Sequence, residues 1–137
     1  MPPEEAKDLD AVLKQHDMDQ IFLLAPTSTD ERIQHVVKQA SGFIYYVSLK
    51  GVTGAATLDT AEAAARIAKI KTHTNVPVGV GFGISDAASA KAMGQVADAV
   101  IVGSALVKPF ATLAIDQAVD QTVNKIKELR AALDELV

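Results

Sequence analysis

Short apolar segments alternate four times with helical patterns along this sequence. The apolar segments cover residues 20–25, 43–48, 76–83 and 99–103. Each is followed by a stretch that has the spacing or the start signals of a helix. Apolar strands separated by helices are typical of a parallel sheet that is covered on both faces. The sequence therefore predicts an α/β fold in which one helix precedes four strand–helix units.

The helix after the first strand has both a start signal and an apolar face. Residues 28–31, Ser-Thr-Asp-Glu, match the capping box, in which a hydroxyl and a carboxylate bind backbone amides at a helix start. A single apolar stripe then follows with helical spacing: Ile33, Val36, Val37 and Ala40. We expect this helix to end at Gly42.

Two more helices and the ends of the chain follow from similar signals. One helix is predicted over about residues 59–72, and Ser85 with Asp86 predicts the start of a short alanine-rich helix. A final helix of about 20 residues is predicted from Ala114. Its apolar stripe comprises Ile115, Val119, Thr122, Ile126, Leu129, Leu133 and Leu136. At the other end, a helix that begins at Pro3 is predicted to use Ala6, Leu9 and Leu13. Because Met1 leads directly into this helix, we expect the chain to begin partway through a larger fold.

The composition limits the classes of fold, site and partner that are compatible with this sequence. With 49% hydrophobic and 22% charged residues, and no linker, residues 1–137 are predicted to form a single α/β unit. The absence of cysteine excludes disulfides, thiolate metal sites and a cysteine nucleophile. A formal net charge of −4 argues against nucleic acid or an anionic membrane as a partner. No apolar run approaches the roughly 18 residues of a membrane helix, and the N-terminus has no signal-peptide pattern, so we expect a cytoplasmic protein.

The loops after the predicted strands are the candidate ligand site, because parallel α/β folds bind ligands beyond the carboxyl ends of their strands. Three of these four loops are rich in glycine and serine: residues 48–54, 81–85 and 103–104. Free amides at such turns and at helix starts bind anions, and phosphate above all. Residues 104–107, which precede Pro109, match the short helix of a barrel phosphate site. The alternative is that these glycines serve only the turns.

Two residue pairs of the predicted strands leave alternatives open. Gly79 and Gly81 share one face with Gly83, so either a ligand or a facing aromatic ring is expected to pack there. Tyr45 and Tyr46 lie on opposite faces of their strand, one toward a barrel interior and one toward the helices. Core packing is the simpler expectation for both tyrosines, and substrate contact is the alternative.

Other chemistry is not indicated by the sequence. The glycines at 79, 81 and 83 do not complete a dinucleotide-binding motif, and no Gly-Lys-Ser/Thr occurs. His16, His35 and His73 lie on or near predicted helices without metal-ligand spacing. No predicted strand end carries a pair of carboxylates, so a general acid–base pair is missing. No histidine or lysine near a strand end is placed to activate Ser48 as a nucleophile.

The loop motifs resemble one family. The segments Ser-Leu-Lys-Gly-Val-Thr-Gly at 48–54, Gly-Phe-Gly-Ile-Ser at 81–85 and Val-Gly-Ser-Ala at 102–105 closely resemble the α subunit of tryptophan synthase, as do residues 2–5 and 22–28. The resemblance covers essentially the whole chain in the family's order and spacing. It implies a (β/α)₈, or TIM, barrel that cleaves indole-3-glycerol phosphate to indole and glyceraldehyde 3-phosphate. The family passes indole to a β subunit, which holds pyridoxal phosphate, so no cofactor is expected in this chain.

The resemblance also assigns roles to residues of this sequence. It implies that Gly54, Gly83, Gly103 and Ser104 hold the substrate's phosphate, mainly through backbone amides. Tyr45 and Phe82 then belong to the substrate pocket. Gly51 begins the loop that closes over substrate, and Thr53 matches the threonine that orients a catalytic aspartate. Lys50 departs from the small residue expected there, which leaves the detailed contacts of this loop open.

The family's two catalytic carboxylates, and most of its contacts with the β subunit, lie upstream of the matched segments. The resemblance therefore implies the C-terminal, (βα)₄ half of a TIM barrel, with a long C-terminal helix. This half binds phosphate but lacks lyase activity alone. An alternative is a non-catalytic half-barrel module that forms a homodimer through its open sheet edges. A third reading, another phosphate-binding barrel enzyme, would need inward carboxylates that the sequence does not show.

Overall fold

The computed structural model describes residues 3–47, 60–81 and 83–136, and its centre is a parallel sheet. The strands are β1 (Leu23–Leu24), β2 (Ile44–Val47), β3 (Val78–Gly81) and β4 (Ala99–Ile101), hydrogen-bonded in that order. All three strand pairs are parallel. The predicted order of parallel strands is confirmed, and β1 and β4 are the outer strands of the described sheet.

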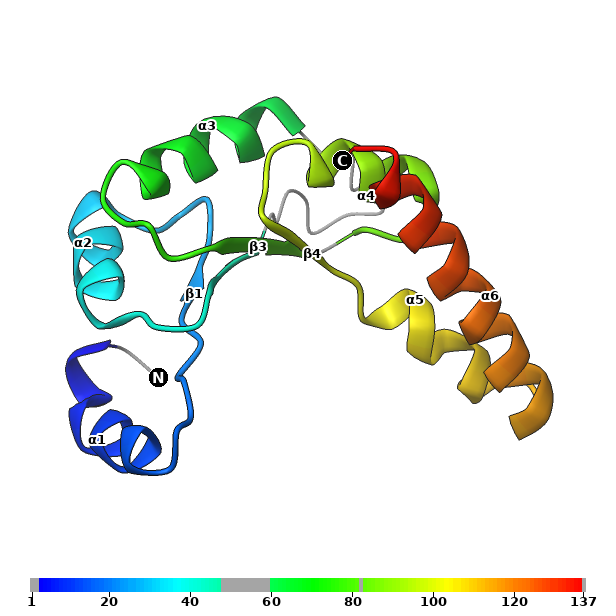
Figure 1. The fold of residues 1–137 in the computed structure, drawn as a ribbon, viewed down its shortest axis with the longest axis horizontal. Helices are drawn as coiled ribbons and strands as arrows, with labels where there is room; N and C mark the ends of the chain where they lie inside the picture. The colour runs from blue at the N-terminus through cyan, green and yellow to red at the C-terminus, as the bar shows by residue number, and fades with distance from the viewer. Residues whose placement is uncertain (1–2, 48–59, 82, 137) are drawn as a thin grey trace.

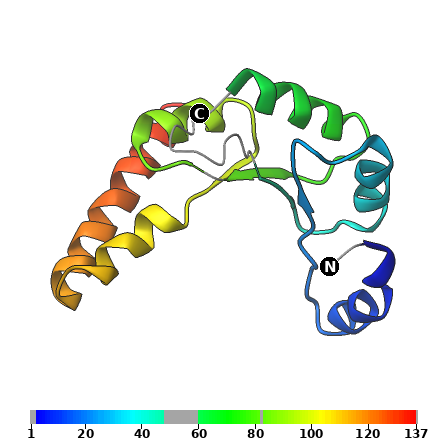
Figure 2. The ribbon, with the colours of Figure 1, turned by 180° about the vertical axis from the view of Figure 1, so that it is seen from behind.

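Helices separate the strands as predicted. A short 3₁₀ turn, η1 (Pro3–Glu5), precedes α1 (Lys7–Gln15), and α2 (Asp30–Gln39), α3 (Thr60–Lys71) and α4 (Ala87–Gly94) connect the strands. After β4 come α5 (Ser104–Val107), the 3₁₀ turn η2 (Lys108–Ala111) and the long α6 (Ile115–Asp134). The ribbon forms an arch, with α1 at one end and α5 and α6 at the other (Figure 1). The view from behind shows the same arch (Figure 2).

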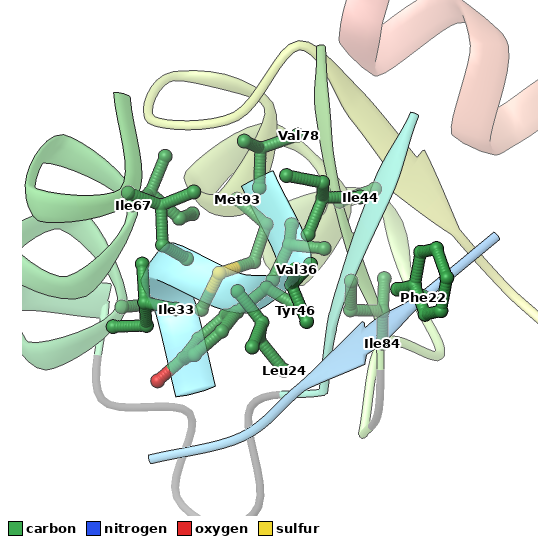
Figure 3. Packing of buried hydrophobic residues seen from close by; sticks show 14 of the residues in the cluster. Phe22, Leu24, Ile33, Val36, Ile44, Tyr46, Ile67, Val78, Ile84 and Met93 are labelled. Atoms are coloured by element: carbon green, nitrogen blue, oxygen red, sulfur yellow. The ribbon is translucent and has the colours of Figure 1, made fainter. Parts of the chain in front are cut away.

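The core lies between one face of the sheet and the helices α2, α3 and α4 (Figure 3). Strand residues alternate in burial, because successive side chains of a strand point to opposite faces. Ile44 and Tyr46 of β2 are almost completely buried, whereas Tyr45 and Val47 between and beside them are only half-buried. This confirms the prediction that the two tyrosines face opposite sides. Tyr46 packs among the helices, and Tyr45 faces the other side of the sheet.

The second face of the sheet, which we call the concave face, comprises Leu23, Phe43, Tyr45, Val47 and Ile101. No described helix lies over it between the two ends of the arch (Figures 1 and 2). Leu23 of the outer strand β1 is 51% exposed on this face. The expectation that helices cover both faces is therefore wrong for the described residues.

Aromatic rings lie over the glycines of β3. A side chain at Gly79 would meet the Phe43 ring at 3.2 Å, and one at Gly81 would meet Cε2 of Tyr45 at 2.6 Å. Of the two alternatives for these side-chain-free positions, the structure thus shows a facing ring at both. Gly83 differs, because it is exposed and has a positive φ of 73°.

Of two predicted helix starts, the one at residues 28–31 is wrong, and the one at Ser85 and Asp86 is confirmed with Asp86 as the cap. The cap of α2 is Thr29, whose Oγ1 accepts from the amide of Arg32 at 3.3 Å, whereas Oγ of Ser28 accepts from the amide of Ala25 at 2.9 Å. The predicted capping box at 28–31 is therefore wrong, since the third residue after Thr29 is not a carboxylate. A true capping box occurs at α4, as Asp86 binds the amide of Ser89 at 2.8 Å and Oγ of Ser89 accepts from the amide of Asp86 at 3.2 Å.

The stripe predicted for the last helix is only partly buried. Leu129 is 6% exposed and packs on the core, but Ile115 is 71% exposed, Val119 45% and Ile126 48%. The sequence shows that these residues are apolar but not whether another element covers them. Leu9 of α1, at 41% exposed, departs from its predicted burial for the same reason.

Asp98 joins β3 and β4 at the amino ends of the strands. Its Oδ2 accepts from the amide of Val78 at 2.8 Å, and its Oδ1 pairs with Nζ of Lys71 at 2.7 Å. Partial burial raises the pKa of Asp98, but these two hydrogen bonds outweigh it, so the pKa lies below its usual value. Polar groups at this end of a barrel sheet contribute to stability rather than to ligand binding.

We expect Gly81→Ala to lower the free energy of unfolding by about 1–3 kcal/mol, because the new methyl group overlaps the Tyr45 ring. Chemical denaturation measures the change. Gly103→Ala is the matched control, since a side chain there meets no atom within 4 Å. The cost of Gly81→Ala should shrink in a Tyr45→Ala background, and an unchanged cost would refute the ring contact as its cause.

We expect Asp98→Asn to destabilise the chain above pH 4 and to have little effect near pH 2. A carboxyl group whose pKa is lower in the folded state stabilises it above the unfolded pKa, and this contribution is lost as the pH falls through the folded pKa. The effect at neutral pH is about 1 kcal/mol, since Asp98 is partly exposed and screened. Denaturant titrations at several pH values test this, with Asp120→Asn on the exposed surface of α6 as control. A pH-independent difference would contradict it.

Candidate functional site

The candidate site lies along the edge of the sheet at which the strands end. Since all the strand pairs are parallel, Leu24, Val47, Gly81 and Ile101 finish at this one edge. We call it the carboxyl edge, and it comprises the described residues 25–29, 83–85 and 103–104. It is the edge at which parallel α/β folds bind their ligands.

The structure places four of the predicted site residues at or near the carboxyl edge. Gly83 follows β3, Gly103 caps α5, and Ser104 is the first residue of α5; all three are exposed. Tyr45 lies on the concave face with its ring over Gly81, the last residue of β3. The remaining predicted site residues lie outside the described part of the chain: Gly51, Thr53, Gly54 and Phe82.

The predicted short helix after the last strand is present. Gly103 caps α5 with its carbonyl oxygen, which accepts from the amide of Leu106 at 2.9 Å, and no side chain caps this helix. Among the hydrogen bonds between described residues, none uses the amides of Ser104 and Ala105. Within the described part of the chain, these two backbone donors at a strand end are thus available to an anion.

A cavity of about 650 Å³ opens beside Ser104. Ser85 from the β3 loop lines it together with Ser104, and the lysines are Lys108 of η2 and Lys125 of α6. Ser85 and Ser104 both lie in glycine- and serine-rich loops identified from the sequence. The two lysines were not predicted as site residues. Lys108 follows Ser104 by about one helical turn, so its position beside Ser104 could have been predicted from the sequence. Lys125, in contrast, reaches the cavity because α6 packs back on α4.

The charge of this cavity is partly compensated. Nζ of Lys125 pairs with Oε2 of Glu128 at 2.8 Å, and Oε1 of Glu128 lies 3.4 Å from the amide of Ala87 at the start of α4. The hydrogen bond from Lys125 lowers the pKa of Glu128, so this carboxylate stays charged. Hydrogen bonds from Ser89 likewise lower the pKa of Asp86. Among the described residues no ion pair is formed by Lys108, so its charge faces the cavity uncompensated.

A second cavity, of about 450 Å³, lies at the other end of the carboxyl edge. It is lined by the ends of β1 and β2, by Thr27, Ser28 and Thr29, and by Arg32. Its walls are thus apolar at the strands and polar at the start of α2. The carboxyl edge therefore offers space at both ends, with a cationic side chain at each.

Acid–base chemistry is not evident in the described residues. None of their polar or charged residues is buried, and the carboxyl groups with a clearly shifted pKa all have it lowered: Asp30, Asp86, Asp98 and Glu128. A general acid needs the opposite shift. No cluster of potential metal ligands, and no helix able to cross a membrane, occurs among them either.

Comparison with known proteins identifies the family. The profile of the family described as tryptophan synthase alpha chain matches residues 1–136. The chain belongs to this family. It is 90% identical over its whole length to the tryptophan synthase alpha chain of Acinetobacter baylyi and 85% identical to that of Acinetobacter baumannii. In both comparisons it spans 51% of the relative's length.

Solved structures support the same conclusion for the fold. The tryptophan synthase of Mycobacterium tuberculosis matches with 38% identity and a TM-score of 0.81, over 97% of this chain and 49% of that chain. Subunit alpha from Legionella pneumophila matches with 30% identity and a TM-score of 0.81, over 98% of this chain and 49% of that chain. The described arch therefore has the geometry of half of a TIM barrel, as predicted, and its family belongs to tryptophan biosynthesis.

Proposed function

We propose that this chain is the phosphate-binding half of a tryptophan synthase α barrel, which holds the phosphate of indole-3-glycerol phosphate or of glyceraldehyde 3-phosphate. The observation that carries the proposal is the start of α5. There the amides of Ser104 and Ala105 make no hydrogen bond to another described residue, and a side chain at Gly103 would meet open space. The family resemblance assigns the substrate's phosphate to these residues, together with Gly54 and Gly83.

The other predicted residues fit this function as parts of one pocket. Gly83, with its positive φ, turns the chain directly after β3, so that backbone rather than a side chain lies at the edge. The ring of Tyr45 lies over Gly81 at the end of β3, and the family resemblance assigns Tyr45 to the substrate pocket. Gly51, Thr53, Gly54 and Phe82 complete the pocket and its closing loop by the same resemblance.

The proposed function separates binding of the substrate's phosphate from catalysis of the lyase reaction. The family's lyase reaction needs two carboxylates from the early strands of the barrel, and the described residues offer no carboxyl group with a raised pKa in their place. The β subunit and its pyridoxal phosphate are the family's partner and cofactor, and most contacts with that subunit belong to the other half of the barrel. The proposed place of action is the cytoplasm, as expected from the sequence.

We expect the purified chain to release no indole from indole-3-glycerol phosphate. An assay for indole, run beside the full-length alpha chain of Acinetobacter baylyi, measures this. The chain should still gain thermal stability from glyceraldehyde 3-phosphate, because a ligand at about 100 times its Kd adds about 2.7 kcal/mol to the folded state. Release of indole would show that the chain does carry the acid–base chemistry of the reaction. A lack of any stabilisation by glyceraldehyde 3-phosphate would contradict phosphate binding.

We expect Gly103→Asp to weaken the binding of glyceraldehyde 3-phosphate at least about tenfold, a loss of about 1.4 kcal/mol. The new carboxylate lies where an anion sits, and the site has room for it, since no atom lies within 4 Å of a side chain at this position. Gly103→Asn is the matched control, with the same shape and no charge. Calorimetry gives both affinities, and equal weakening by the two variants would refute an anion at Gly103.

A further inference from the structure

We propose that the charge of Lys108 attracts the ligand's phosphate to Ser104, so that this lysine decides how tightly the site binds it. The inference rests on the proposed phosphate function and deepens it, because the family resemblance assigns the phosphate to three glycines and Ser104 and to no lysine. Lys108 lines the cavity of about 650 Å³ that opens beside Ser104.

The start of α5 needs a full charge nearby to hold an anion firmly. A helix dipole is the sum of aligned peptide units, and α5 has only four residues, so its own field is weak. The amides of Ser104 and Ala105 can give an anion hydrogen bonds, which fix its orientation. A cationic side chain beside them adds the attraction that so few peptide dipoles lack.

The cavity contains a second lysine, but carboxylates compensate its charge. Nζ of Lys125 pairs with Oε2 of Glu128 at 2.8 Å. Hydrogen bonds from Ser89 lower the pKa of Asp86, and the nearby charge of Lys125 lowers it further. Lys125 and these two carboxylates together carry an excess of negative charge, which repels an anion. Among the described residues that line the cavity, Lys108 is the cation that no carboxylate neutralises.

The backbone of α5 places Lys108 over Ser104. Lys108 caps the end of this helix, and its amide donates to the carbonyl oxygen of Ser104, four residues earlier. Residues four apart lie on the same face of a helix, and each Cα–Cβ bond tilts toward the helix N-terminus. The side chain of Lys108 therefore begins on the face of Ser104 and is directed toward the start of α5.

Contacts between described residues hold this arrangement in place. Oγ1 of Thr122 on α6 donates to the carbonyl oxygen of Leu106 at 3.1 Å, which joins α5 to α6. Pro109, the residue after Lys108, is buried, whereas Lys108 itself is exposed. Lys108 thus combines a fixed backbone with a side chain that can follow a ligand in the cavity.

Calorimetry with glyceraldehyde 3-phosphate tests the inference on the purified chain. We expect Lys108→Gln to raise the dissociation constant about tenfold at low ionic strength, because it removes the attracting charge. Lys108→Arg keeps the charge and should bind like the wild type. Lys127→Gln is the matched control, since Lys127 is exposed on α6 and is not among the described residues that line the cavity. It should change the dissociation constant less than about twofold.

Added salt distinguishes an effect of charge from an effect of shape. The Debye length falls from about 30 Å at about 0.01 M ionic strength to about 3 Å at about 1 M. The difference between the wild type and Lys108→Gln should therefore shrink to less than about threefold at the higher ionic strength. A difference that persists there would overturn the inference, because Lys108 would then act by packing and not by its charge.

The same titrations separate the role of Lys108 from the proposed function on which it rests. If the wild type binds no glyceraldehyde 3-phosphate, both fail. If the wild type binds and Lys108→Gln binds equally well, or Lys127→Gln loses as much affinity, only the role of Lys108 fails. A loss that is confined to Lys108→Gln, absent in Lys108→Arg and screened by salt would support it.

Discussion

One face of the sheet packs against α2, α3 and α4, and this buried layer holds the strands in register. Ile44, Tyr46, Val78 and Val80 alternate along β2 and β3 and are almost completely buried. Burial of such a side chain contributes about 1.5–3 kcal/mol, so a shift of either strand by one residue would forfeit several of these contacts at once. This fixes the register, and the helical crossovers fix the parallel direction of every strand.

Because the strands are parallel, the amino and carboxyl edges of the sheet carry different groups. At the amino edge Asp98 binds Lys71 and the amide of Val78, and these bonds connect β3 to β4. At the carboxyl edge the chain turns through Gly83 and Gly103, and Ser104 begins a helix whose first amides bond to no other described residue. An anion site made of backbone at a strand end needs only the register of β3 and β4. It therefore depends on the buried face and not on any particular catalytic side chain.

The sequence predicted what is local and periodic, and it was wrong where the outcome depends on neighbours. The strand order, the start of α4 at Asp86 and the short helix before Pro109 all follow from local chemistry. The predicted six-residue strand at 20–25 is reduced to β1, because this outer strand pairs on one side only and Pro26 lacks an amide. Likewise, Lys125 joins the cavity of Ser104 only through the packing of α6 on α4, which no spacing in the sequence indicates.

The second sheet face is shaped partly by contacts within this half of the barrel and is partly left exposed. The rings of Phe43 and Tyr45 over Gly79 and Gly81 are contacts within this half, so the end of β3 is shaped without a partner. Leu23 and the apolar residues Ile115, Val119 and Ile126 of α6, in contrast, are largely exposed. The contacts that shape the end of β3 are thus internal to the described residues, whereas β1 and α6 leave apolar surface exposed.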